Sequence, residues 1–278
     1  MRARGRAILH FPGFMLAAFF LLPLAVMLVV SFFHRTASWY EPGFEFTHYA
    51  RLLSPVYLNA FLRSMLYAMI SATIAVTLAF PFAYLISRLH ARAQVVILVF
   101  VLCVLSLSEV IVAFSWSTLL SRSSGISNLL VLVGLMDFPA SWARGTTAVL
   151  AGLSYYNIPF GVLILYPGCS RFDSELTEAA ETMGASPLRA FFTVVVPVLR
   201  APLMSAWVVL FVFSMGSLVT PQWLGNPSDW MIANHIDEEI MNRGNVPFGA
   251  AMAMIYLLIT ACLLSLLRLA TRREEKRQ

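Results

Sequence analysis

Six apolar stretches, each about as long as a bilayer is thick, run through this chain of 278 residues. A helix needs roughly 20 apolar residues to cross the hydrocarbon core of a membrane. The stretches that reach this length are Phe11–Phe33, Phe61–Ser87, Gln94–Leu120, Thr146–Pro167, Val198–Thr220 and Phe248–Leu269. Charged residues make up only 12% of the chain, against about 25% in a soluble globular protein. We therefore predict an all-α integral membrane protein with six transmembrane helices, which excludes an ordinary soluble enzyme, a disordered tail and a disulfide-rich secreted module.

The distribution of basic residues predicts the orientation in the membrane, because short cytoplasmic loops carry an excess of Lys and Arg. With a cytoplasmic N-terminus, 13 basic residues fall inside and 6 fall outside. The six outside are Arg35, Arg51, Arg63, Arg122, Arg144 and Arg243. Both termini are therefore predicted to be cytoplasmic, with residues 1–10 as a short tail, 11–270 as the transmembrane domain and 271–278 as a basic tail. The first stretch is too long for a signal peptide and lacks a cleavage site, so it is predicted to be a retained anchor.

A single lysine, Lys276, limits the chemistry of the chain. A phosphate-binding loop needs a lysine after a glycine-rich turn, and no such turn precedes Lys276. If ATP drives this protein, a partner must bind and hydrolyse it. The cysteines Cys103, Cys169 and Cys262 form no C-x-x-C pair and are predicted to be small packing residues, so no metal site or disulfide is expected. The basic tail suits anionic lipid and requires no nucleic-acid role.

The predicted cytoplasmic loop at residues 171–197 contains a helix with one apolar face. Asp173 is placed to cap this helix, and Glu175 in its first turn suits the positive end of the helix dipole. The apolar face comprises Leu176, Ala179, Ala180 and Met183. Gly184 then suits the left-handed position that ends a helix.

A second helix is predicted to start at Ser186-Pro187, with serine as N-cap and proline as first helical residue. Its apolar stripe is Leu188, Phe191, Phe192 and Val195. The small alanines of the first helix favour docking in a groove of another protein. The alternative is an amphipathic helix resting on lipid. Alanine is a poor lipid anchor, and three glutamates would be repelled by an anionic leaflet.

The same loop resembles a family motif. Glu178-Ala179-Ala180, three residues, Gly184, nine residues and then Val194-Val195-Val196-Pro197 is similar to the EAA loop of ABC importer permeases. The family pattern is Glu-Ala-Ala, three residues, Gly, nine residues and then Ile-x-Leu-Pro. This chain departs from it only in having valine in place of the isoleucine and of the leucine. The six stretches and the position of the loop before the fifth also resemble the type I importer permeases over nearly the whole chain.

The resemblance implies a type I, MetI-like permease fold in the bacterial inner membrane with a cytoplasmic EAA coupling helix. It implies two copies of a cytoplasmic ABC ATPase, which bind ATP and Mg²⁺, a second permease subunit in a homo- or heterodimer, and a periplasmic substrate-binding protein. The ATPase-coupling residues implied are Glu178, Ala179, Ala180, Gly184 and Pro197. No catalytic residue and no cofactor is expected in this chain.

Polar groups within the apolar stretches are candidates for the substrate pathway. Glu109 falls near the middle of the third stretch, where an acidic residue costs about 2.5–3.5 kcal/mol on insertion scales. It is predicted to face a cavity or a partner; the alternative is a protonated, hydrogen-bonded glutamate packed against another helix. Trp116 lies on the same stretch, and Tyr155, Tyr156 and Asn157 precede Pro159 in the fourth. The amphipathic rings of the aromatic residues in this group would suit either a substrate pathway or packing at the membrane interface.

The predicted outer loop before the sixth stretch is acidic and aromatic, with Asp237 and Glu238 as further pathway candidates. Carboxylates and aromatic rings suit a cationic amine, but the acidic run could instead dock a binding protein or be solvated. The segment Leu224–Asn234 and the later Pro247–Ala251 resemble loops of spermidine/putrescine permeases, although Ala233 replaces their usual glycine. This resemblance implies a polyamine or a related small solute.

Three other functional classes remain open at this point. One is an exporter, in which the ATPase is usually fused or the loops are long, but the missing lysine-bearing phosphate loop argues against a fused ATPase in this chain. A proton-coupled secondary transporter of a small organic cation would use Glu109 as a proton relay and would need no ATPase, but the EAA spacing argues against it. A membrane-embedded enzyme would need a catalytic cluster, and the five histidines are scattered with no H-E-x-x-H motif.

Overall fold

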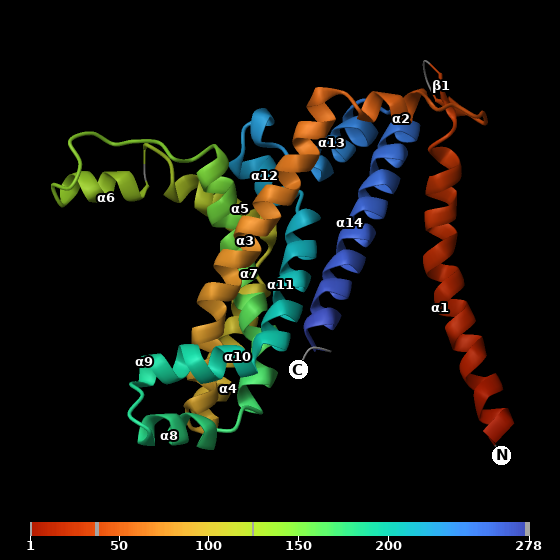
Figure 1. Ribbon diagram of the computed structural model, residues 1–278. Helices are drawn as coiled ribbons and strands as arrows, with labels where there is room; N and C mark the ends of the chain where they lie inside the picture. The colour runs from red at the N-terminus through yellow and green to blue at the C-terminus, as the bar shows by residue number, and fades with distance from the viewer. Residues whose placement is uncertain (1, 37–38, 124, 276–278) are drawn as a thin grey trace. The chain divides into compact units, whose positions relative to one another are not determined.

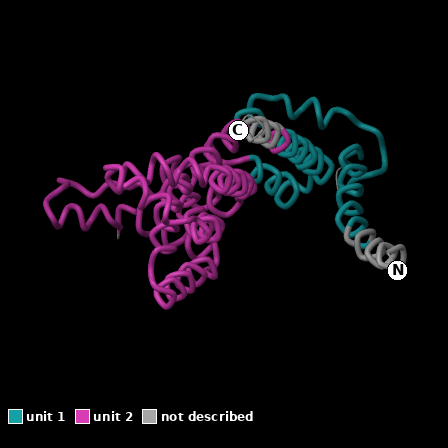
Figure 2. The backbone as a smooth tube through the Cα atoms, turned by 60° about the horizontal axis from the view of Figure 1, so that its bottom comes forward, with its two compact units in different colours: residues 1–59, 232–262 teal, residues 60–231, 263–278 magenta. Residues whose placement is uncertain are grey.

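The computed structural model describes residues 2–36, 39–123 and 125–275, without the side chains of residues 2–14, Leu16 and 266–275. Residues 1 and 276–278, which belong to the two predicted tails, lie outside the described residues. The chain forms two compact units, residues 1–59 with 232–262 and residues 60–231 with 263–278 (Figure 2). Nearly all of the regular structure is helical, as predicted.

The first unit combines the first 59 residues with residues 232–262. It contains the helices α1 (Arg2–Val30), α2 (Thr47–Leu52) and α13 (Ile232–Asp237), the π-helical turn η3 (Glu238–Asn242), the start of α3 (Pro55–Arg88) and most of α14 (Val246–Glu275). It also holds two short antiparallel strands that the all-α prediction did not include, β1 (His34–Arg35) and β2 (Tyr40–Glu41), with His34 opposite Glu41.

The second unit contains the rest of α3, the middle of the chain and the end of α14 from residue 263 (Figure 1). Its elements are α4 (Ala91–Leu105), α5 (Glu109–Leu119), α6 (Ile126–Leu132), α7 (Thr146–Ser170), α8 (Glu175–Thr182), α9 (Pro187–Ala190), the π-helical turn η1 (Phe191–Val195), α10 (Val196–Val198), α11 (Arg200–Met215), α12 (Val219–Leu224) and the 3₁₀ turn η2 (Pro227–Asp229). A buried cluster joins α3, α4, α7, η1 and α11 through residues such as Ala83, Val101, Leu165, Val195 and Ala206.

Three described helices are long and apolar enough to cross a membrane unbroken: α3, α7 and residues 246–265 of α14. They coincide with the second, fourth and sixth predicted spans. The described apolar part of the first predicted span, Ala17–Val30, is shorter than a bilayer crossing. The total of six spans therefore stays a prediction.

The third predicted span is not a continuous helix, and in this respect the prediction was wrong. α4 and α5 meet at a bend of 87° across Ser106–Ser108. The Ser106 hydroxyl donates to the Leu102 carbonyl oxygen at 2.9 Å, a back-bond that often bends helices. The Leu107 carbonyl at the break accepts a hydrogen bond from the Tyr156 hydroxyl at 2.9 Å. A neighbouring helix thus satisfies a backbone group that the bend frees.

The fifth predicted span, Val198–Thr220, is also interrupted. The helical stretch Pro187–Val198 meets α11 at a bend of 73°, and α11 ends at Met215, so Thr220 falls in the separate helix α12. Proline has no N–H to donate to the carbonyl four residues earlier, so Pro197 removes one hydrogen bond from the helical stretch before the bend. Pro202 lies in the first turn of α11, where the N–H groups have no partner within the helix, so it is tolerated just after the bend. The hydropathy of the sequence alone does not reveal these two bends.

Candidate functional site: a surface helix and four polar clusters

The loop at 171–197 folds as predicted, into a helix, a tight turn and a second helix. The Asp173 carboxylate accepts a hydrogen bond from the Glu175 backbone N–H at 3.0 Å, although the N-cap residue itself is Ser174. At the other end of α8, Gly184 has a φ of +92°. Its N–H donates to the Glu181 carbonyl at 2.9 Å, and the Ala185 N–H donates to the Ala180 carbonyl at 3.0 Å. This pair of bonds is the Schellman arrangement, which requires a left-handed residue where Gly184 stands.

The apolar face of α8 is largely uncovered by the rest of the described chain. Met183 is 84% exposed and Leu176 is 46% exposed, and Ala179 is exposed beside them, while Ala180 is 8% exposed. Glu178 is also exposed. An apolar strip of this kind on a short surface helix is suited to contact with another molecule.

The second helix anchors this surface on the bundle. The Ser186 hydroxyl caps α9 by accepting from the Arg189 N–H at 3.3 Å. In η1, Val195 is fully buried, and the Phe191 ring packs against Phe80 with centroids 5.2 Å apart. Leu188 and Phe192 stay 71% and 60% exposed, so only two of the four residues of the predicted second stripe are packed. A displacement of α8 and α9 would therefore be transmitted to α3 and α11 through the core that contains η1.

Glu109 lies at the α4–α5 bend rather than inside a straight helix, as the first residue of α5. Its Oε1 atom accepts hydrogen bonds from the Thr220 hydroxyl at 2.8 Å, from the Thr220 backbone N–H at 3.3 Å and from the Ser217 hydroxyl at 3.3 Å. The carboxylate thus joins two broken helical segments, α5 and α12. Glu109 is partly exposed.

The aromatic candidates form a connected row near this bend. The Trp116 and Tyr155 rings meet edge to face with centroids 5.8 Å apart, and Tyr155 meets Tyr156 at 6.2 Å. Asn157 faces elsewhere: it is 1% exposed, and its Nδ2 atom donates to Ser71 at 2.8 Å and to Ser214 at 2.5 Å. Asn157 therefore links α3, α7 and α11 inside the bundle.

The loop that resembles the polyamine permeases is organised by Asp229. Its Oδ2 atom accepts from the backbone N–H and the side-chain amide of Asn226, at 3.1 and 3.3 Å. Its Oδ1 atom accepts from the Thr146 hydroxyl at 3.0 Å and from the Tyr67 hydroxyl at 3.4 Å. A Cβ on Gly225 would lie 2.6 Å from the Pro221 carbonyl oxygen, which explains the glycine at the turn. Asp229 thus fastens η2 to the start of α7.

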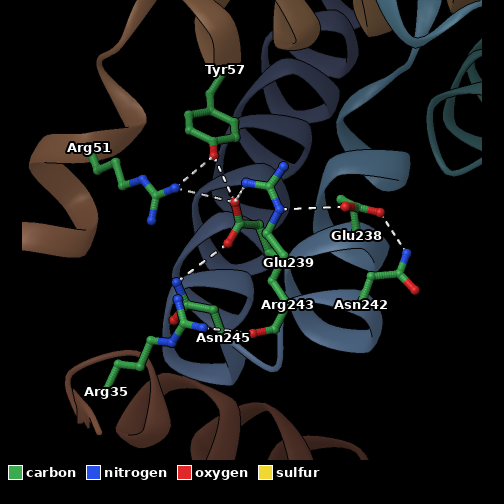
Figure 3. A network of polar contacts seen from close by, with 8 residues as sticks. All are labelled: Arg35, Arg51, Tyr57, Glu238, Glu239, Asn242, Arg243 and Asn245. Atoms are coloured by element: carbon green, nitrogen blue, oxygen red, sulfur yellow. Dashed lines mark hydrogen bonds and ion pairs between the residues drawn. The ribbon is translucent and has the colours of Figure 1, made fainter. Parts of the chain in front are cut away.

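The strongest polar network in the first unit centres on Glu239, which the sequence analysis included in the acidic run 237–239 but did not predict as a site residue (Figure 3). Its side chain is only 2% exposed. Oε1 accepts from the Tyr57 hydroxyl at 2.9 Å, from Arg243 at 2.9 Å and from Arg51 at 3.3 Å, and Oε2 accepts from the Asn245 amide at 3.4 Å. Only the Glu239–Arg243 spacing of four residues was visible in the sequence, because Arg51 and Tyr57 are more than 180 residues away.

The predicted acidic candidates flank this network. Glu238 pairs with the Arg243 Nε atom at 3.4 Å and accepts from the Asn242 amide at 2.5 Å, while Asp237 is the partly exposed last residue of α13. A pocket of about 390 Å³ opens here. It is lined by Arg51, Ser54, Val56, Tyr57, His235, Glu238, Glu239 and Arg243. The two glutamates are thus matched by two arginines within the chain.

The sequence of this chain matches a known protein family. The family model described as "Binding-protein-dependent transport system inner membrane component" matches residues 75–276, which include the whole of α8 and its turn. The chain belongs to this family. It is the permease component of an ABC importer, a membrane subunit of a transport system in the inner membrane.

Individual relatives extend the match to most of the chain. The spermidine/putrescine transport system permease protein PotB of Salmonella typhimurium (strain SL1344) is 27% identical over 258 residues, which cover 92% of this chain and 90% of the relative. PotB of Escherichia coli (strain K12) is 27% identical over 250 residues, covering 90% and 91%. A bacterial alginate ABC transporter, crystallised with an alginate-bound periplasmic protein, matches with a TM-score of 0.74 at 16% identity over 98% of this chain and 95% of that one, which shows the shared fold.

Proposed function

We propose that this permease forms half of a translocation pathway and is driven through α8 by a separate cytoplasmic ATPase that binds ATP and Mg²⁺. The observation that carries the proposal is the exposed strip of Leu176, Ala179 and Met183 on a helix whose turn and following segment are firmly held. Closure of two ATPase subunits would move α8, and η1 would pass the movement to the bundle. Glu178, Ala180, Gly184 and Pro197 shape and support this contact.

The proposed assembly contains a second permease, two ATPase subunits and a periplasmic binding protein. The solved alginate transporter in complex with its periplasmic protein supports the last of these partners. The excess of basic residues in the terminal regions and loops on the α8 side, 13 against 6 on the other side, supports cytoplasmic termini and a cytoplasmic α8. Isolation of the complex distinguishes a homodimer from a heterodimer of permeases.

We infer a polyamine or a related small cationic solute as the substrate. The PotB relatives support this class, since their names specify spermidine and putrescine and the match covers about nine-tenths of each chain. Glu109 is the proposed cation contact, with Trp116, Tyr155 and Tyr156 as the aromatic wall next to it. Asn157 supports the pathway from inside the bundle. Asp237 and Glu238 form the proposed outer acidic entrance.

Uptake of labelled spermidine by the reconstituted complex tests this function. Proteoliposomes that hold the permeases, the ATPase and the binding protein are expected to accumulate spermidine only with ATP. Without the ATPase, uptake is expected to be lost. Glu109→Gln is expected to weaken uptake, because the amide removes the negative charge while its oxygen can still accept from the Thr220 hydroxyl. Asp137→Asn, in the loop before α7, is the control and should leave uptake unchanged.

Different results would overturn different parts of the proposal. Uptake that is driven by a proton gradient and needs no ATPase would indicate the secondary transporter. ATP-dependent uptake that Glu109→Gln leaves unaltered would make Glu109 a structural residue. ATP hydrolysis that the loaded binding protein stimulates without any movement of spermidine would refute the substrate class alone.

A further inference from the structure

The segment between α5 and α7, residues 121–145, carries an apolar surface that no described part of the chain covers. We name it the α6 segment. Five of its large apolar side chains are 60–82% exposed: Leu129, Leu132, Val133, Leu135 and Phe138. Burial of apolar side chains of this size is favourable, so leaving five of them in water would be costly.

The α6 segment is fastened at its base. The Trp142 backbone N–H donates to the Leu120 carbonyl at 2.9 Å, so a hydrogen bond joins the chain just before the segment to the chain near its end. The Asn128 side chain donates to the Arg122 carbonyl at 3.1 Å, and Ser127 is 1% exposed. The polar groups of α6 thus bond within the segment while the stripe of Leu129, Leu132 and Val133 faces away.

The direction of α6 fits the plane of a membrane. Figure 1 shows α6 lying crosswise to α3 and α7, and Figure 2 shows it extending sideways from the same unit. α7 has 25 residues and is about 37 Å long, enough to cross the bilayer, and the α6 segment ends where α7 begins. A helix that lies crosswise to α7 and next to its start would run parallel to the membrane surface, at the level where α7 enters the bilayer.

Residues at both ends of the segment suit a lipid headgroup region. Arg122 and Arg144 are exposed, and neither makes an ion pair with a described residue. Asp137 is the only acidic residue from 121 to 145, so the segment is net positive. Trp142 is 38% exposed beside Arg144. Tryptophan and arginine next to an apolar stripe are typical anchors at a membrane interface.

We propose that the α6 segment is a membrane-interface anchor. Its stripe of Leu129, Leu132 and Val133, continued by Phe138, is embedded in the acyl chains of the leaflet at the start of α7, and Arg122 and Arg144 bind lipid phosphates. The occupant is therefore lipid that surrounds the transporter. This anchor holds the start of α7, the helix whose other end leads into α8, at a fixed depth in the membrane.

Fluorescence of a labelled cysteine tests this proposal independently of transport. Cys103, Cys169 and Cys262 are replaced by serine, a cysteine is introduced as Leu132→Cys or Phe138→Cys, and the assembled complex is placed in phosphatidylethanolamine/phosphatidylglycerol nanodiscs. An NBD label at either position is expected to emit at shorter wavelength and to be quenched by lipids with a nitroxide near the headgroup, not by iodide. Ser228→Cys, in the polar loop that Asp229 fastens to the start of α7, is the matched control and should respond to iodide.

Two results would overturn the proposal. Quenching of Leu132→Cys by iodide to the same extent as Ser228→Cys would place the segment in water. Protection from both quenchers would mean that another protein, such as the second permease, covers it. A complex that binds nucleotide and substrate normally but gives either result would leave the proposed transport function intact and refute only the anchor.

Discussion

Replacing Gly184 with valine is expected to reduce substrate-stimulated ATP hydrolysis by the assembled transporter to the unstimulated rate. Gly184 has a φ of +92°, a conformation that costs an L-residue about 1–2 kcal/mol and a β-branched one more. A Cβ on Gly184 meets no atom within 4 Å, so the whole effect comes from the backbone. The bonds from Gly184 and Ala185 to the last turn of α8 would be lost, and α8 would leave the position from which it contacts the ATPase. ATP hydrolysis with and without loaded binding protein measures this effect.

Two further variants separate coupling from general damage. Gly134 also has a positive φ, +78°, with nothing within 4 Å of an added Cβ, but it lies in the α6 segment. Gly134→Val imposes similar strain away from α8 and should leave the stimulation intact. Gly184→Asn should restore part of it, because asparagine adopts the left-handed conformation more readily than valine. Normal stimulation in Gly184→Val at normal membrane levels would show that the turn has no coupling role.

The double replacement Arg51→Met with Arg243→Met is expected to cause the largest loss of stability among variants of the first unit. Glu239 is 2% exposed, whereas the two arginine side chains are 46% and 52% exposed. Removing both arginines would leave a buried carboxylate without a positive partner, which costs about 3–5 kcal/mol. Glu239→Gln leaves two guanidinium groups that water can reach, so its cost should be much smaller. Thermal unfolding of the purified protein in detergent measures the order of the two effects.

The triple variant provides the control for this prediction. Adding Glu239→Gln to the double replacement removes the stranded charge and keeps an acceptor for the Tyr57 hydroxyl. It should therefore recover most of the lost stability. A triple variant that is as unstable as the double one would indicate that packing of the arginine side chains, including Arg51 on the Phe248 ring at 4.3 Å, accounts for the loss.

The loop at 171–197 could be predicted from sequence because its signals are local. Gly184 ends α8 since few other residues tolerate its φ, and Ser186-Pro187 starts α9 through a hydroxyl three residues from the N–H that it caps. Each signal depends on backbone chemistry within one turn of helix. The unbroken spans α3, α7 and α14 were predicted for a similar reason, since length and hydropathy decide whether a helix can cross a bilayer.

The broken spans and the Glu239 network could not be predicted in this way. The bend at Ser106–Ser108 depends on Tyr156, about 50 residues away, which satisfies the freed Leu107 carbonyl. Glu239 is buried because Arg51 and Tyr57, from the other end of the chain, neutralise and hydrogen-bond it. The sequence shows acidic residues next to position 239 but does not show which of them would pair with an arginine. Likewise Glu109 was placed near the middle of the third span, whereas it begins α5 after the bend and joins α5 to α12.

Site-specific crosslinking from α8 tests most directly whether a separate ATPase subunit binds this helix. In the cysteine-free background, Ala179→Cys, on the exposed face, and Ala180→Cys, at a buried neighbouring position, are labelled with benzophenone maleimide in the assembled transporter. Irradiation is expected to join the Ala179→Cys chain to the ATPase subunit, with a yield that changes when ATP is added, and to give little such product from Ala180→Cys. An intact complex in which Ala179→Cys crosslinks only to lipid, with or without ATP, would contradict the account.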